Sequence, residues 1–121
     1  MSVRVLAIDD SRTIRELLRA TLEEEGFTFD CAVDGVDGIK KFGEFDPDVV
    51  ITDINMPNLD GFGVIEALRG EDVGTTVPII VLTTEYSDKL KARARAAGAT
   101  GWMVKPFDDE SLISVLRRVT G

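Results

Sequence analysis

The segment DVVITDINMPNLDG, Asp48 to Gly61, joins an apolar run to a carboxylate. Residues 49–51 are all β-branched, and such a run is typical of a strand that is covered on both faces. Asp53 follows within two residues. An aspartate in this place ordinarily caps the next helix, but Pro57 disfavours helical geometry at the residue before it. The segment therefore predicts a buried strand that ends at an acid, and a capping role for Asp53 stays the alternative.

Apolar runs and segments of helical periodicity alternate along the whole chain. The expected strands are residues 3–8, 27–33, 49–53, 77–84 and 100–104. The first expected helix carries Ile14, Leu17, Leu18, Thr21 and Leu22 on its buried face, leaves Arg12, Arg15 and Arg19 solvated, and ends at Gly26. The later helices are expected after Asp34 (with Val36, Ile39 and Phe42), from Asp60–Gly61 to Gly70, from Ser87–Asp88 to Gly98, and from Asp108 or Asp109 through Val119.

This strict alternation predicts an α/β fold in which a parallel sheet lies between layers of helices. Ten elements in 121 residues are too few for an eight-fold barrel, so the sheet is expected to be open and doubly wound, a five-stranded (βα)5 arrangement. In such sheets the functional crevice lies at the carboxyl ends of the strands. The polar residues at those ends are Asp9 and Asp10, Asp53, Thr83 and Thr84, and Lys105.

Length and composition limit the class of protein and the chemistry that it can carry out. The length of 121 residues predicts one domain, 1–121, and a hydrophobic fraction of 44% predicts a globular protein. No apolar run is long enough to span a membrane, and the opening residues are not expected to form a signal peptide, so a cytoplasmic location is expected. Cys31 is expected to be a small core residue. A net charge of −8 argues against nucleic acid as a partner, and the absence of histidine excludes imidazole-based catalysis.

Three carboxylates at one edge repel each other, by roughly 3 kcal/mol for a pair about 5 Å apart. Lys105 and a divalent cation would offset this charge, and hard oxygen ligands favour Mg²⁺. A phosphoryl group fits beside such a metal, with Asp53 as its nucleophile. Each residue also has an ordinary alternative: one of Asp9, Asp10 and Ser11 caps a helix, the threonines are strand formers or caps, Lys105 is a solvated strand end, and Glu85 complements a helix dipole.

The segments AIDDS (7–11), DVVITDINMPNLDG (48–61), PIIVLTT (78–84) and VKPF (104–107) together resemble the receiver domain of two-component response regulators, most closely the single-domain, chemotaxis CheY-like type. The resemblance covers essentially the whole chain and implies a flavodoxin-like, CheY-like fold with strand order 2-1-3-4-5. It implies a cis Lys105–Pro106 bond. It also implies a signalling phosphoacceptor, catalysing only its own phosphorylation and dephosphorylation.

Residue by residue, the resemblance implies that Asp53 accepts a phosphoryl group from a phosphohistidine on a sensor histidine kinase. Mg²⁺ would be held by Asp10, Asp53 and the backbone carbonyl of Asn55, with Asp9 acting largely through water. Lys105 and Thr83 would contact the phosphoryl oxygens. Thr84 would lie beside the phosphoryl pocket, and Trp102 would be the aromatic residue that changes position on phosphorylation. Asn55 and Glu85 would influence the rate of dephosphorylation.

Two residues depart from the family pattern. Trp102 stands where Tyr or Phe is usual, which puts a simple inward rotation of the aromatic ring in question. Thr84 stands where a small residue is common, and its β-branched hydroxyl would narrow access to the phosphoryl group. Asn55 and Glu85 favour a short-lived phosphoryl state, whereas Thr84 favours a longer one.

The expected output is a protein contact, because no output domain is expected after Gly121. The contact face would be formed by the fourth helix, fifth strand and fifth helix, and the flagellar motor switch is the partner that the CheY-like type implies; a phosphatase is a further candidate partner. The clustered cations of this face suggest an acidic partner: Lys89, Lys91, Arg93, Arg95, Arg117 and Arg118.

Three other functions compete with this reading. A phosphate sink or relay intermediate would use the same chemistry without a motor target. A Mg²⁺-dependent aspartyl-phosphate phosphatase of the haloacid dehalogenase group is disfavoured, because Asp9 and Asp10 are adjacent rather than two apart and no cap domain is expected. A flavodoxin is disfavoured because carboxylates would repel a flavin phosphate.

Overall fold

The computed structural model describes residues 2–121, and its elements follow the expected alternation of strands and helices. In chain order they are β1 (Arg4–Ile8), α1 (Arg12–Glu24), β2 (Thr28–Ala32), α2 (Gly35–Phe45), β3 (Val49–Thr52), α3 (Gly61–Arg69), β4 (Ile79–Thr83), α4 (Asp88–Ala97), β5 (Gly101–Val104) and α5 (Asp109–Thr120).

Within residues 2–121 the five strands form one sheet in the order β2-β1-β3-β4-β5, and every neighbouring pair is parallel. The α/β doubly wound fold and the strand order are thereby confirmed. The chain moves outward from β1 to β2 and then crosses to β3 on the other side of β1. The direction of winding therefore reverses between β1 and β3, and the crevice of an open α/β sheet lies at the carboxyl ends of those two strands.

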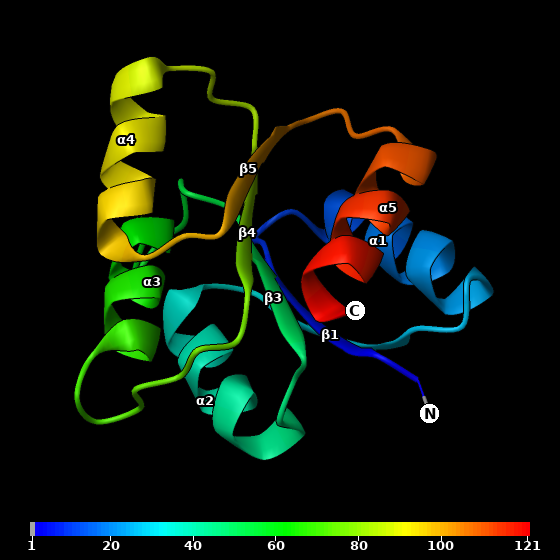
Figure 1. The fold of residues 1–121 in the computed structure, drawn as a ribbon, viewed down its shortest axis with the longest axis horizontal. Helices are drawn as coiled ribbons and strands as arrows, with labels where there is room; N and C mark the ends of the chain where they lie inside the picture. Colours follow the sequence, from blue (N-terminus) through cyan, green and yellow to red (C-terminus); the bar gives the residue numbers. More distant parts are fainter. Residues whose placement is uncertain (1) are drawn as a thin grey trace.

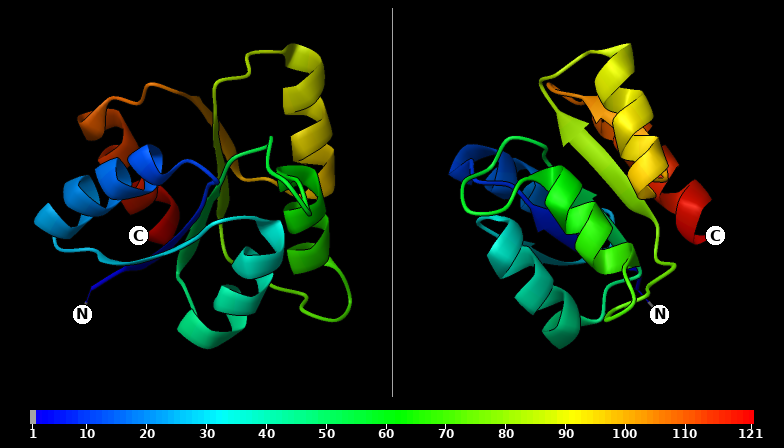
Figure 2. Two further views of the ribbon diagram at one scale, coloured as in Figure 1. Left: turned by 180° about the vertical axis from the view of Figure 1, so that it is seen from behind. Right: turned by 90° about the vertical axis from the view of Figure 1, so that its left-hand side faces the viewer.

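Helices cover both faces of the sheet, with α1 and α5 on one side and α2, α3 and α4 on the other (Figures 1 and 2). Because side chains alternate along a strand, β1 supplies both cores: Val5 and Ala7 face the first layer, Leu6 and Ile8 the second. The helices add Leu18, Leu22, Leu112 and Leu116 to the first core and Phe62, Ile65, Leu68 and Ala94 to the second.

Among residues 2–121, every helix begins after a polar residue whose side chain accepts a hydrogen bond from the backbone N–H three residues further along the chain. The five caps are Ser11, Asp34, Asp60, Ser87 and Asp108. Ser11 is thus the cap among the three candidates at the start of α1, and Asp60 caps α3 at 2.8 Å from the Gly63 N–H. The capping alternative for Asp53 is therefore wrong, so its carboxylate requires another explanation.

The strand boundaries differ slightly from those expected. β4 covers Ile79–Thr83 rather than residues 77–84, and β1 begins at Arg4 rather than at residue 3. Pro78 has no N–H to donate to a ladder, which fits a strand that starts after it. Thr84 is exposed and lies beyond the last paired residue of β4.

Two apolar residues expected on buried helix faces are exposed instead. Leu17 is 50% exposed and Val36 is 58% exposed. In α1 the fully buried contact is the narrow i, i+4 ridge of Leu18 and Leu22, so Leu17 lies to one side of it. In α2 the buried positions include Gly38, because a Cβ there would lie 2.5 Å from the Ile8 Cδ1 atom. A helix that approaches a strand this closely makes its contact through glycine rather than through valine.

Cys31 was expected in the core but is only partly buried, on the edge strand β2. Two cationic side chains cover it from neighbouring helices. The Arg19 guanidinium lies 3.7 Å from its sulfur, and the Lys41 ammonium donates to its backbone carbonyl at 2.9 Å. A strand at the edge of a sheet has only one neighbouring strand, so long polar side chains complete its cover here.

Candidate functional site

Three carboxylates meet where β1 and β3 end. Asp9, Asp10 and Asp53 each place an oxygen within 4.8 Å of the others. Asp9 is 3% exposed and Asp53 is 8% exposed, whereas Asp10 lies at the surface. The strand-end rule therefore predicted correctly that these three residues lie together.

Lys105 bridges the two buried carboxylates. Its ammonium donates to the Asp9 Oδ2 atom at 2.7 Å and to the Asp53 Oδ2 atom at 2.8 Å, and the Lys105–Pro106 bond that follows is cis. Burial raises the pKa of Asp9, although hydrogen bonds from Lys105 and Ser11 oppose the rise. Burial alone would lower the pKa of Lys105, but its hydrogen bonds to Asp53 and Asp9 outweigh that effect and raise it. The lysine therefore stays cationic at neutral pH.

The Asp53 carboxylate is fixed at both oxygens. Its Oδ2 atom accepts from Lys105, and its Oδ1 atom accepts from the Ile54 N–H at 2.6 Å. Its backbone is fixed as well, because the Asp53 N–H donates to the Ile8 carbonyl at 3.0 Å. A carboxylate oxygen carries two lone pairs, so each oxygen keeps one lone pair for a further ligand or an electrophile. The strand end thus presents an oriented nucleophile.

Gly61 is required for the loop that surrounds Asp53. A Cβ at this position would lie 2.1 Å from the Asp53 carbonyl oxygen and 2.8 Å from the Ile54 Cα atom. The Gly61 N–H also donates to the Ile54 carbonyl at 2.9 Å, which turns the chain back into α3. The sequence identified Gly61 only as the start of a helix. The Asp60–Gly61 pair is the signal that could have indicated a close approach of two backbones.

Thr83 and Thr84 lie in different environments. Thr83 is fully buried, and its Oγ1 atom accepts from the Glu85 N–H at 3.3 Å. Because the hydroxyl acts as an acceptor in that bond, its own proton remains available for donation. Thr84 is exposed at the start of the β4–α4 loop.

Glu85 connects this loop to two other parts of the site. Its Oε1 atom accepts from the Asn55 side-chain amide at 3.1 Å, and its backbone carbonyl accepts from the Trp102 indole N–H at 3.3 Å. Trp102 therefore lies beside the β4–α4 loop and outside the carboxylate cluster. A chain of contacts runs from Thr83 through the Glu85 backbone to the indole.

Arg15 was expected to be solvated, but it is partly buried and donates to the Asp9 carbonyl at 2.8 Å. The Ser11 N–H adds a second contact at 2.9 Å, to the Asp9 Oδ1 atom. These bonds fix the β1–α1 loop and hence the direction of the Asp9 carboxylate. The position of Arg15 one helical turn after Ser11 is the only sequence signal for this role.

The cations expected on one face are divided among several faces. The Arg93 guanidinium lies 3.9 Å above the Phe62 ring of α3, and Arg117 lies 4.9 Å above the Phe27 ring. Arg117 also pairs with Glu25 at 3.6 Å. Lys91 and Arg95, in contrast, border a cavity beside Trp102. The prediction that all six cations share the α4–β5–α5 face is therefore wrong for Arg93 and Arg117.

The acidic edge suits a hard divalent cation. Three carboxylates and one ammonium leave a net charge of −2, since −3 + 1 = −2, and the donor atoms are oxygens of the kind that Mg²⁺ prefers. Asp10 is exposed, so the cluster is accessible from solvent at this residue.

Among residues 2–121, no helix is long and apolar enough to cross a membrane.

A sequence profile of the response regulator receiver domain matches residues 5–117, and the chain belongs to this family. Receiver domains are the phosphate-accepting domains of two-component systems. The response regulator MprA of Mycobacterium tuberculosis is 39% identical over 117 residues, which are 97% of this chain and 50% of that protein. The chain thus spans about half the length of the curated relatives it matches.

Solved structures agree with this assignment. The chemotaxis protein CheY4 of Vibrio cholerae superposes with a TM-score of 0.92 at 41% identity, covering 98% of this chain and 99% of that one. The receiver domain of the Francisella response regulator 1452 superposes with a TM-score of 0.90 at 27% identity, covering 98% and 97%. The suspected family and the CheY-like fold are therefore confirmed.

Proposed function

We propose that this chain is a phosphorylation-dependent switch in which Asp53 accepts a phosphoryl group from a phosphohistidine of a sensor histidine kinase. The supporting observation is the arrangement of Asp53 itself: its side chain, which is 11% exposed, is held by Lys105 and the Ile54 N–H inside a cluster of acids. A buried acid cluster lowers stability, and the caps of the helices that follow β1 and β3 are Ser11 and Asp60 rather than Asp53.

The transfer is a substitution at phosphorus. A lone pair on an Asp53 oxygen forms the new O–P bond while the N–P bond of the phosphohistidine breaks. The electrons of that bond stay on the imidazole nitrogen, and a proton from solvent water converts the leaving group into the neutral histidine side chain of the kinase. Lys105 neutralises charge on the phosphoryl oxygens, and the free hydroxyl proton of Thr83 donates to one of them. Thr84 borders the entrance.

Asp9, Asp10, Asp53 and the Asn55 backbone carbonyl are the groups that would hold Mg²⁺, and the ion supplies charge stabilisation for the transferring phosphoryl group when bound. Asn55 and Glu85 hydrogen-bond to each other at 3.1 Å next to the acceptor. Their polar side chains would position the water that later hydrolyses the acyl phosphate. The chain thereby catalyses only its own phosphorylation and dephosphorylation, and a partner phosphatase would act on the same bond.

The response to phosphorylation passes through Thr83, Glu85 and Trp102. The Thr83 hydroxyl accepts a hydrogen bond from the Glu85 N–H, so movement of Thr83 toward a phosphoryl group displaces the Glu85 backbone. The Glu85 carbonyl in turn accepts a hydrogen bond from the Trp102 indole. Trp102 lies on β5 beside α4, so the signal reaches the face formed by α4, β5 and α5. A change in this face alters its affinity for a protein partner. This altered binding is the proposed signalling output, and its proposed location is the cytoplasm.

The hypothesis that the chain acts in chemotaxis is supported by its likeness, at 41% identity, to CheY4 of Vibrio cholerae, which is a chemotaxis protein. The proposed partner is accordingly the flagellar motor switch or a similar protein target. A sink or relay role would retain phosphorylation of Asp53 without such binding. A pull-down of purified motor switch protein with the beryllofluoride-activated chain distinguishes the two, because only the motor reading predicts capture that depends on activation.

Fluorescence of Trp102, the one tryptophan in the chain, tests the switch directly. Beryllofluoride with Mg²⁺ mimics an aspartyl phosphate, so its addition should change the emission of the native protein. The Asp53→Asn variant is the control and should give no change. A response of equal size in both proteins would show that the emission reports something other than occupation at Asp53.

A further inference from the structure

Thr52, the last residue of β3, places a hydroxyl among apolar side chains. It is fully buried, and its partners in the sheet are Ile8 of β1 and Val81 of β4, which are fully buried as well. Val50, two residues earlier on the same face of the strand, belongs to the core beneath α2, α3 and α4. Valine has nearly the shape of threonine and needs no hydrogen-bond partner, so packing alone would favour valine at this position.

The Thr52 hydroxyl donates a hydrogen bond to the backbone carbonyl oxygen of Asp53 at 2.9 Å. Asp53 lies beyond the last paired residue of β3, and among residues 2–121 this hydroxyl is the one donor to that oxygen. The backbone of Gly61 packs closely against the same oxygen, because a Cβ at Gly61 would lie 2.1 Å from it. A hydrogen bond from Thr52 and a close backbone contact therefore determine where the Asp53 carbonyl points.

The direction of this carbonyl sets the direction of the Ile54 N–H, because the two groups belong to one planar peptide unit. That N–H donates to the Oδ1 atom of Asp53 at 2.6 Å, while Lys105 donates to the Oδ2 atom at 2.8 Å. The orientation of the carboxylate thus depends on the orientation of the peptide that follows it. The Thr52 hydroxyl acts on the carboxylate through this peptide.

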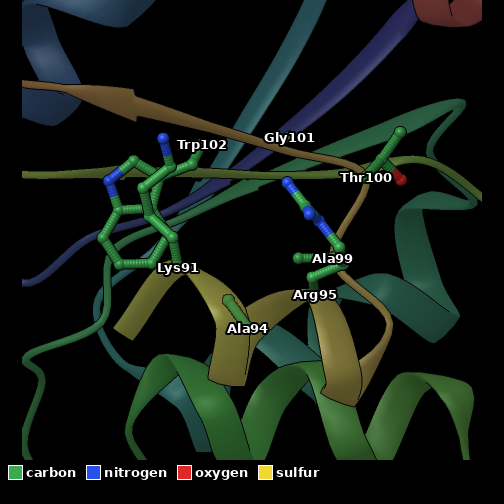
Figure 3. A pocket seen from close by; sticks show the side chains of 7 residues that line it. All are labelled: Lys91, Ala94, Arg95, Ala99, Thr100, Gly101 and Trp102. Atoms are coloured by element: carbon green, nitrogen blue, oxygen red, sulfur yellow. The ribbon is translucent and has the colours of Figure 1, made fainter. Parts of the chain in front are cut away.

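A buried hydroxyl can instead serve a cavity, where it binds water or a ligand. A cavity of about 160 Å³ lies between α4 and β5, on the side of the sheet that Thr52 faces. Figure 3 shows Lys91, Arg95 and Trp102 around this cavity, and Thr52 is not among its lining residues. The contact that the structure gives the Thr52 hydroxyl is therefore the one to the Asp53 carbonyl.

We propose that Thr52 is a positioning residue for the phosphorylation of Asp53. Its hydroxyl fixes the Asp53–Ile54 peptide, so that the Ile54 N–H holds the carboxylate in the orientation that attacks phosphorus. This inference rests on the proposed function and adds a further residue to it. Because Thr52 lies outside the carboxylate cluster, its hydroxyl should affect the rate of transfer more than the stability of the fold.

The first test compares two substitutions of Thr52. Thr52→Val removes the hydroxyl and keeps the branched shape, whereas Thr52→Ser keeps the hydroxyl. The rate of phosphorylation by acetyl phosphate and Mg²⁺, followed by intact mass, should fall at least about tenfold in Thr52→Val, because misplacing a reacting group slows transfer steeply. Thr52→Ser should stay within about threefold of the native rate. Equal rates in the native chain and Thr52→Val would overturn the proposal and leave the proposed function standing.

Urea unfolding of the same variants separates positioning from packing. Thr52→Val should unfold near the native urea concentration, because the lost hydrogen bond is offset by an apolar group in an apolar layer. Ile79→Val is the matched control, since Ile79 is fully buried in the same core and the change removes one methylene group. It should lower the stability and keep the native rate within about twofold. Rates that follow stability across these variants would overturn the proposal.

The amide proton of Ile54 reports on the positioning without any phosphoryl group. Its short hydrogen bond to a carboxylate should move its NMR resonance downfield. In Thr52→Val the resonance should move upfield and the amide should exchange with solvent at least about tenfold faster, whereas Thr52→Ser should resemble the native chain. This change in a protein that acetyl phosphate does not phosphorylate would support the positioning and contradict the proposed function. Phosphorylation with an unchanged Ile54 amide in Thr52→Val would do the reverse.

Discussion

Replacing Lys105 with methionine removes the ammonium that contacts Asp9 and Asp53 at 2.7 and 2.8 Å but keeps a long unbranched side chain. The three side chains are 8%, 4% and 11% exposed, so two carboxylates lose their partner in a largely buried site. Breaking a buried ion pair costs about 3–5 kcal/mol. Asp10 opens the cluster to water, which favours the lower end, so we expect a loss of about 3 kcal/mol at neutral pH.

The loss should depend on pH in a definite direction. Without Lys105 the pKa of Asp9 rises further, because the hydrogen bond and positive charge that oppose the effect of burial are lost. An acid whose pKa is raised in the folded state binds protons more tightly there than in the unfolded chain. The stability deficit is therefore greatest above the raised pKa of Asp9 and shrinks as the pH falls through it. The stability gap between native and Lys105→Met protein should narrow between neutral pH and about pH 5.

Urea unfolding followed by circular dichroism at the two pH values measures this gap. Lys89→Met is the control, because Lys89 is an exposed lysine on α4 and its replacement should change stability by less than about 0.5 kcal/mol. A Lys105→Met deficit below about 1 kcal/mol, or one that stays constant across the pH range, would refute the argument that this ammonium offsets carboxylate repulsion.

Three further predictions concern the loop, the caps and the metal. Gly61→Ala should unfold at a distinctly lower urea concentration, because its Cβ would lie 2.1 Å from the Asp53 carbonyl oxygen. Gly43→Ala is the control: its Cβ would meet no atom within 4 Å, and its free energy of unfolding should rise by up to about 1 kcal/mol. The hydrogen bonds from the Ser111 hydroxyl and N–H lower the pKa of Asp108. The stability that this helix cap contributes is therefore fully present above about pH 4 and is lost as the pH falls through the lowered pKa. Acid unfolding of Asp108→Asn should accordingly depend less on pH than that of the native chain. Mg²⁺ should raise the melting temperature of the native chain more than that of Asp10→Asn, as scanning calorimetry would measure.

The fold and the centre of the site could be predicted because both follow from local patterns. β-branched runs alternate with helical periods, and parallel strands that share one edge must bring their terminal residues together. Asp9, Asp53 and Lys105 meet for that reason, although Lys105 lies 96 residues from Asp9 in the chain. The caps were also recognisable, since Ser and Asp before an apolar period accept the first free N–H groups.

What the sequence could not predict depends on how closely and from which side elements pack. Periodicity placed Val36 on a buried face, but the approach of α2 to Ile8 requires Gly38 there instead. Arg117 faces Phe27 and Glu25, and no local pattern connects residues so far apart in the chain. The role of Arg15 depends in the same way on where the Asp9 carbonyl points.

The most direct test of the account is the intact mass of the protein after incubation with Mg²⁺ and acetyl phosphate, sampled within seconds to minutes. The native chain should gain the mass of one phosphoryl group, and the Asp53→Asn variant should gain none. Omission of Mg²⁺ should reduce the gain in the native chain. A gain in the Asp53→Asn variant equal to that of the native chain, or none in the native chain at any time, would contradict the assignment of Asp53 as the phosphoacceptor.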